Sequence, residues 1–211
     1  MYINAIIVPG FSEFERCAEP LAEALTSGPY ALAGSAEIVC LSDALDNPER
    51  YEKAFKGNLV VTHSAGLLAV NRALEVIALN PPEPTTLRKT IKGANAVNSS
   101  KNEGIEEGIV VGGIFEVAKE LGRHPVISAK IPLAIRTFSS AQHLVDRAAS
   151  FVNGRSLFYT DQDQFGFTRP EVVDYANQNG IFARILQGEH NHAMFQPKDM
   201  LRQVTLAIAE R

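Results

Sequence analysis

The stretch LVVTHSAG, residues 59–66, decides how the rest of the chain is interpreted. Leu59 to Val61 are apolar and mostly β-branched, which is typical of a short strand that is buried on both faces. The segment LLAVNRAL that follows, residues 67–74, has the spacing of apolar residues that predicts a helix. Ser64 is therefore expected at the apex of a sharp turn between a strand and a helix.

Such a turn would prepare Ser64 to act as a nucleophile. Its hydroxyl would stand above the carboxyl end of the sheet, and the Ala65 backbone N–H would point to the place where an oxyanion forms. A turn this tight favours small residues two positions before and after the serine, which Gly66 satisfies better than the β-branched Thr62. The alternative interpretation is an ordinary strand-to-helix connection with a capping serine.

The pentapeptide THSAG resembles the nucleophile elbow of the α/β-hydrolase family, which is written G-x-S-x-G, with Thr62 where glycine is usual. The resemblance implies a serine nucleophile, a histidine base and an acid that orients the base, in the chain order serine, acid, histidine. It implies no cofactor and no metal ion.

Length and composition predict one globular domain over residues 1–211, because 45% of the residues are hydrophobic and 21% are charged. A net charge of −4 without charge blocks gives no electrostatic case for nucleic acid or an anionic membrane. Cys17 and Cys40 are interpreted as small buried side chains in a reducing compartment. The chain has neither a basic flank before its first apolar run nor a run long enough to span a membrane, so we expect a cytoplasmic protein.

The rest of the chain predicts a doubly wound α/β fold with a mostly parallel sheet of about six strands and helices on both faces. Strands are expected at residues 3–8, 37–41, 59–61, 75–79, 156–160 and 181–187, and helices at 13–26, 47–55, 140–152, 169–179 and 198–210. Pro20 either kinks the first of these helices or marks its start. The pattern resembles an α/β-hydrolase fold trimmed of its first two strands.

The alternation of strands and helices is interrupted at residues 83–135, which we interpret as an insertion. It contains frequent helix breakers, and residues 114–121 are its best helical segment. The insertion follows the carboxyl end of a strand, where open parallel sheets bind ligands. We therefore expect a helical cap over Ser64, and the alternative is a surface elaboration without a role.

Two carboxylates compete for the acid position in the loop after the fifth predicted strand. Asp163 lies farther beyond that strand than Asp161, and this offset resembles the family pattern more closely. We assign the acid to Asp163. Asp161 would instead hold the turn through hydrogen bonds to the backbone.

Two histidines compete for the base in GEHNHAMFQP, residues 188–197. The segment resembles the family's terminal loop, in which a glycine precedes the histidine and a proline opens the last helix. His190 and Pro197 reproduce that spacing, so His190 is the expected base and His192 the alternate. His63 is expected to point away from the serine, and His124 and His143 are expected at the surface or in the cap.

The second oxyanion donor is expected from the loop after the first strand, Pro9-Gly10-Phe11-Ser12. This loop resembles the family's His-Gly-x loop, with Pro9 in place of the histidine. The backbone N–H of Phe11 would then act together with the N–H of Ala65.

These residues predict a serine hydrolase that acts on a small-molecule carboxylic ester or related acyl compound. The competing hypothesis is a non-catalytic protein that binds a small molecule on the same fold, motivated by Thr62 and Pro9. A third is acyl transfer, or lyase or peroxidase chemistry without a cofactor, on the same triad.

Overall fold

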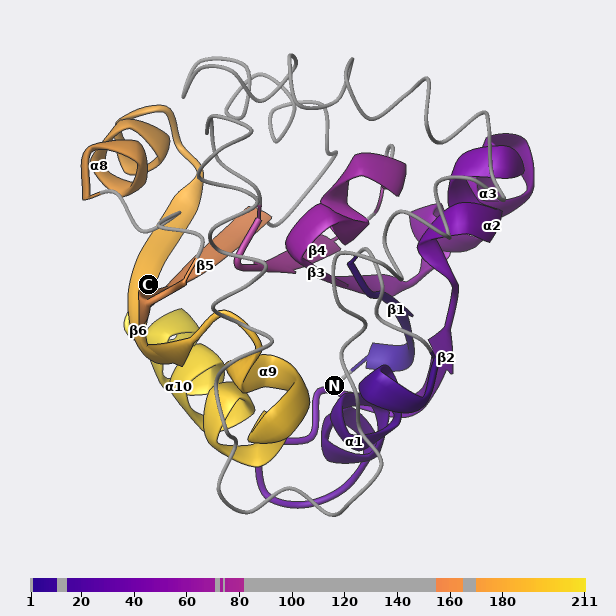
Figure 1. Ribbon diagram of the computed structural model, residues 1–211, viewed down its shortest axis with the longest axis horizontal. Coiled ribbons are helices and arrows are strands. Elements are labelled where there is room, and N and C mark those ends of the chain that lie inside the picture. Colours follow the sequence, from indigo (N-terminus) through magenta and orange to yellow (C-terminus); the bar gives the residue numbers. More distant parts are fainter. Residues whose placement is uncertain (1, 11–14, 71–72, 74, 82–154, 165–169) are drawn as a thin grey trace.

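A computed structural model describes residues 2–10, 15–70, 73, 75–81, 155–164 and 170–211 (Figure 1). Its strands are β1 (Tyr2–Val8), β2 (Ala33–Ile38), β3 (Leu59–His63), β4 (Glu75–Leu79), β5 (Arg155–Gln162) and β6 (Phe182–Glu189). Its helices are α1 (Glu15–Thr26), α2 (Leu41–Asp46), α3 (Pro48–Gly57), the 3₁₀ helix η1 (Ser64–Ala69), α8 (Pro170–Gln178), α9 (His192–Phe195) and α10 (Pro197–Ala209).

The strands form one sheet in the order β2-β1-β3-β4-β5-β6, and every neighbouring pair is parallel. All six strands therefore end at the same edge. β1 is followed in sequence by β2 on one side, whereas β3 lies on its other side, so the strand order reverses between β1 and β3. Ligands of open parallel sheets bind at such a point, outside the carboxyl ends of the strands.

Helices cover both faces of the sheet. Figure 1 shows α1, α9 and α10 on one face and α2, α3 and η1 on the other. Leu59 and Val61 of β3 join the hydrophobic core on the α1 face, and Val60 between them joins the core on the η1 face. A strand covered on both faces has no polar side to present to water, which explains why this stretch is continuously apolar.

The sequence predicts the strands well where apolar runs are buried on both faces. β3, β4 and β5 include the predicted segments, and β6 differs from its prediction by one residue at the start and two at the end. The prediction for the second strand is wrong, because β2 is Ala33–Ile38 rather than residues 37–41. β2 lies at the sheet edge, where Gly34 and Ser35 are exposed, while the apolar run after it continues into α2.

The predicted helices at 13–26, 47–55, 169–179 and 198–210 correspond to α1, α3, α8 and α10, whereas α2 and α9 have no predicted counterpart. α1 extends through Pro20, so this proline does not mark the helix start. The helix after the serine is present, but it is a 3₁₀ helix that ends at Ala69. A 3₁₀ helix rises about 2.0 Å per residue against 1.5 Å in an α-helix, which suits the short connection between β3 and β4. The predicted cap at 83–135 and the helix at 140–152 lie outside the described residues.

No helix among the residues that the structure describes is both long enough and apolar enough to cross a membrane.

We predict that Gly66→Ala destabilises the fold by about 2–3 kcal/mol through steric overlap. A Cβ atom at position 66 would overlap the carbonyl oxygen of Val8 and lie 2.9 Å from its carbonyl carbon. Urea unfolding measures the loss. Gly57→Ala is the matched control, because a Cβ atom there meets nothing within 4 Å. Equal stability of the two variants would contradict the close approach of η1 to the end of β1.

Candidate active site

Ser64 adopts a backbone conformation that few residues other than glycine adopt. Its φ is +47°, in the left-handed region, and the side chain follows directly after β3. This conformation costs an L-residue about 1–2 kcal/mol, so the surrounding structure must impose it. Strained residues of this kind cluster at functional sites.

Gly66 shows how the turn is imposed. The backbone of η1 passes so close to the carbonyl groups of Val8 and Pro9 at the end of β1 that no side chain fits at position 66. The glycine therefore allows the chain to leave β3 sharply and cross the end of β1. Gly66 meets the requirement for a small residue that the sequence indicates at this position.

Thr62 does not lie in the turn. It is the fourth residue of β3, fully buried and paired with Val8 of β1 and Ala78 of β4. A β-branched side chain is favourable in a strand, and the left-handed conformation begins only at Ser64. The departure from glycine at this position is thus compatible with the turn.

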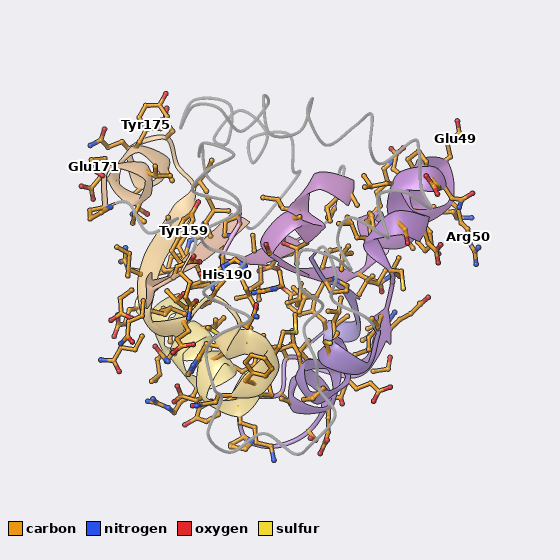
Figure 2. All side chains as sticks on the ribbon, in the orientation of Figure 1. Glu49, Arg50, Tyr159, Glu171, Tyr175 and His190 are labelled. Carbon is orange, nitrogen blue, oxygen red and sulfur yellow. The ribbon has the colours of Figure 1, made fainter. Side chains whose placement is uncertain are left out.

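His190 and Asp163 form a buried pair. The distance from His190 Nδ1 to Asp163 Oδ2 is 2.6 Å, and 3% of the histidine side chain and none of the aspartate side chain are exposed. Figure 2 likewise shows His190 in the interior of the molecule, whereas Glu49, Arg50 and Glu171 point outward. An ionised carboxylate only accepts hydrogen bonds, so His190 carries its proton on Nδ1 when neutral, and Nε2 is then the basic nitrogen.

The backbone of His190 is held as firmly as its ring. Its carbonyl oxygen accepts hydrogen bonds from His63 Nε2 at 2.8 Å and from Asn80 Nδ2 at 2.7 Å. Its N–H donates to Gln164 Oε1 at 3.0 Å. His63 immediately precedes Ser64, so the structure brings His190 beside the residue next to the candidate nucleophile.

A bulge at the end of β6 leads the chain into this position. The register between β5 and β6 shifts after Thr160, because Thr160 pairs with Leu186 but Gln162 pairs with Glu189. Gly188, in the extra stretch of β6, has a φ of +136°, and its N–H donates to Asp161 Oδ1 at 3.0 Å. Bulges redirect side chains next to functional sites. Asp161 thus makes the kind of backbone contact that the sequence predicts for it.

His192 belongs to a different group of side chains from His190. Its Nε2 lies 2.9 Å from Asp199 Oδ2 at the start of α10, and its ring packs against Gly188. Asp199 also accepts hydrogen bonds from Arg202 and Gln203. Hydrogen bonds from Arg202 and then His192 lower the pKa of Asp199 to about 2. His192, the alternate base of the sequence prediction, therefore contacts Asp199 and Gly188, whereas Asp163 contacts His190.

The remaining predicted residues are only partly described. Ala65 is buried as the second residue of η1, where a backbone N–H has no acceptor within the helix. Phe11, His124 and His143 lie outside the described residues.

Sequence reasoning overlooked the roles of His63 and Asn80. The sequence predicts only that His63 points away from the serine, whereas the structure shows a fully buried side chain that contacts the His190 backbone. Asn80 is interpreted from the sequence only as the end of a strand. The signal that was available is its position, because a polar residue that ends the strand beside the serine strand lies at the edge where ligands bind.

No family model and no curated protein matches the chain. Solved structures do match it. The enzyme 1H-3-hydroxy-4-oxoquinoline 2,4-dioxygenase has a TM-score of 0.58 and 13% identity, over 98% of this chain and 92% of that one. The thioesterase domain from the curacin biosynthetic pathway has a TM-score of 0.55 and 13% identity, over 97% and 91% of the two chains. A structure from the work on LipS and LipT, two metagenome-derived lipolytic enzymes, has a TM-score of 0.53 and 11% identity, over 100% and 97%.

The chain has the α/β-hydrolase fold. Its all-parallel sheet, with six strands in the described residues, corresponds to a trimmed version of that fold. The structures that it resembles are enzymes of this α/β-hydrolase fold. At these identities the likeness concerns the fold and not the reaction.

We predict that Asp199→Asn destabilises the protein by less than about 1 kcal/mol near neutral pH, because the Asp199 side chain is 38% exposed. The folded-state pKa is about 2 against an ordinary 3.8. The contribution of a carboxyl group with a lowered pKa is complete above about pH 4 and is lost as the pH falls towards 2. Urea unfolding of both proteins between pH 2 and pH 7 measures this. A difference that grows as the pH falls would contradict the assigned partners.

Proposed function

We propose that this protein is a serine hydrolase that cleaves a small-molecule carboxylic ester or a related acyl compound. The observation that carries the proposal is the buried hydrogen bond of 2.6 Å between His190 and Asp163, beside the elbow that carries Ser64. A buried imidazole that is oriented by a carboxylate is the base that a serine nucleophile requires. Two of the three structures compared above, the thioesterase domain and the lipolytic enzyme, support acyl chemistry by name.

The proposed reaction begins with attack of Ser64 Oγ on the substrate carbonyl carbon, while His190 Nε2 takes the hydroxyl proton. The oxyanion accepts hydrogen bonds from the backbone N–H groups of Ala65 and Phe11. Collapse of the intermediate expels the alcohol, which receives the proton from His190, and leaves an acyl group on Ser64. Water then attacks the acyl group with the same base, releasing the acid and restoring the serine.

Asp163 serves this cycle by holding the ring of His190. It keeps the proton on Nδ1, so that Nε2 is the nitrogen that accepts the serine proton, and it balances the charge of the imidazolium. The side chain of Asp163 is fully buried, and this strengthens its interaction with the cation relative to the same pair in water.

A second candidate is chemistry in which His190 removes a proton from the substrate and no acyl-enzyme forms. Its support is that two similar structures, a 2,4-dioxygenase and a quinolone ring-cleavage protein, have names that describe chemistry other than ester hydrolysis, each with a TM-score of 0.58 and 12–13% identity. The same His190 and Asp163 pair would then act as the base, and Ser64 would not be a nucleophile.

The role of Ser64 as the nucleophile can be tested by labelling and by kinetics. A fluorophosphonate should label one serine, and Ser64→Ala should abolish the labelling and lower kcat on p-nitrophenyl esters on the order of 10⁴-fold or more. Intact-mass spectrometry and a chain-length panel of these esters measure both effects. Labelling that persists in the Ser64→Ala variant would refute the assignment. Turnover that survives the substitution would instead favour proton abstraction.

Substitution of each aspartate in turn shows whether Asp163 or Asp161 orients His190. Asp163→Asn should lower kcat about 10³- to 10⁴-fold, because an amide that donates to Nδ1 favours the wrong tautomer of His190. Asp161→Asn is the matched control, since the amide oxygen can still accept the hydrogen bond from the Gly188 N–H, and kcat should stay nearly unchanged. Steady-state kinetics compare the two variants. The reverse order of effects would assign the acid to Asp161.

A further inference from the structure

Two buried side chains donate hydrogen bonds to one atom, the carbonyl oxygen of His190. His63 Nε2 lies 2.8 Å from it and Asn80 Nδ2 lies 2.7 Å from it. A carbonyl oxygen has two lone pairs, so the two donors saturate it. The donors come from the ends of β3 and β4, two adjacent strands, while His190 follows β6.

Asn80 is joined to β5 by both its side chain and its backbone N–H. Its Oδ1 accepts hydrogen bonds from the N–H and the hydroxyl of Thr160 in β5, at 2.8 and 3.1 Å. Its backbone N–H donates to the carbonyl of Phe158 at 2.7 Å. Asn80 is 1% exposed and has a φ of +46°, a conformation in which asparagine is several-fold enriched. Its amide therefore joins β5 to the loop that carries His190.

His63 connects the two halves of the candidate site directly. It is fully buried, and because a carbonyl oxygen only accepts, its Nε2 carries a proton. The centroids of the His63 and His190 rings are 5.0 Å apart. Since His63 precedes Ser64 in sequence, one hydrogen bond links the side chain of the residue beside the nucleophile to the backbone of the base.

We propose that His63 and Asn80 are positioning residues, which hold the backbone of His190 at a fixed place relative to Ser64. This inference rests on the proposed function and extends it. Asp163 restrains the orientation of the His190 ring, whereas the two donors restrain where the residue stands. Proton transfer needs both, because a displacement of about 1 Å can cost on the order of 100-fold in rate.

A purely structural role would predict a different pattern of effects. Loss of a hydrogen bond that only stabilises the loop lowers the free energy of unfolding and leaves the chemical step unchanged. Loss of a positioning contact lowers kcat and leaves KM near its original value, because substrate binding does not depend on the base. The two roles are therefore distinguished by kinetics rather than by stability.

The experiment uses three variants at the proposed contacts and one matched control. Asn80→Ala removes one donor, and His63→Leu removes the other. His63→Gln restores a buried N–H donor on a side chain of similar reach. Asn177→Ala is the control, because the Asn177 amide likewise bridges two backbone groups, the N–H and the carbonyl of Ala183, at the opposite end of β6 from His190.

Three measurements are made on each protein. The first is kcat and KM on a p-nitrophenyl ester, and the second is urea unfolding. The third is the ¹⁵N spectrum of the histidine rings, in which the His190 signals are identified by their absence in His190→Gln. This spectrum reports the tautomer of His190 and does not depend on turnover.

We expect Asn80→Ala and His63→Leu to lower kcat roughly 10- to 100-fold without a matching rise in KM. We expect His63→Gln to recover most of the loss, and Asn177→Ala to lose stability but not kcat. In the spectra, His190 should be protonated at Nδ1 in the wild-type protein and a mixture of tautomers in Asn80→Ala and His63→Leu. If both of these variants retain the kcat and the His190 tautomer of the control, the proposal is wrong.

The kinetic measurements and the ¹⁵N spectra together separate the failure of this proposal from the failure of the proposed function. If the wild-type protein hydrolyses no ester and Ser64 is not labelled, the hydrolase assignment fails, and the spectra alone decide whether His63 and Asn80 hold His190. If the enzyme is active, an unchanged kcat together with an unchanged His190 spectrum in both variants overturns the positioning role.

Discussion

The parallel arrangement of all six described strands is the constraint on which the candidate site depends. It brings the carboxyl ends of strands that are far apart in sequence to one edge, where β3 delivers Ser64, β4 delivers Asn80, β5 leads to Asp163 and β6 leads to His190. Burial of the sheet on both faces fixes the register, because a shift by one residue would exchange the side chains of the two cores. The apolar packing that stabilises the fold thus also determines which polar residues meet.

The sequence predicts the parts of this arrangement that are written in local patterns. Continuous apolar runs indicate β3 and β4, and the order of the loops after the strands indicates that Asp163 and His190 lie together, which agrees with their contact. The edge strand β2 was misplaced because an edge position tolerates polar residues, and the apolar run beside it has a different use in α2. Local pattern does not distinguish these two uses.

The contacts of His63 and Asn80 with His190 cannot be predicted from the local sequence pattern. They join residues 127 and 110 positions from His190 in sequence, and they arise only once the sheet order is known. The bulge in β6 is equally hidden, since the sequence indicates Gly188 only as the glycine that precedes the expected base. The two histidines of the loop show the result, because residues two positions apart face different partners, Asp163 and Asp199.

Three hydrogen bonds hold the main chain of His190. Its carbonyl oxygen accepts two of them, and its N–H donates the third to Gln164. Every amino acid except proline supplies the same backbone carbonyl and N–H at this position. The shape of this loop is therefore inherited separately from the chemistry of the side chain that it presents. A variant that exchanged the imidazole for another side chain would therefore keep these main-chain hydrogen bonds, and the loop would present the new side chain from the same place.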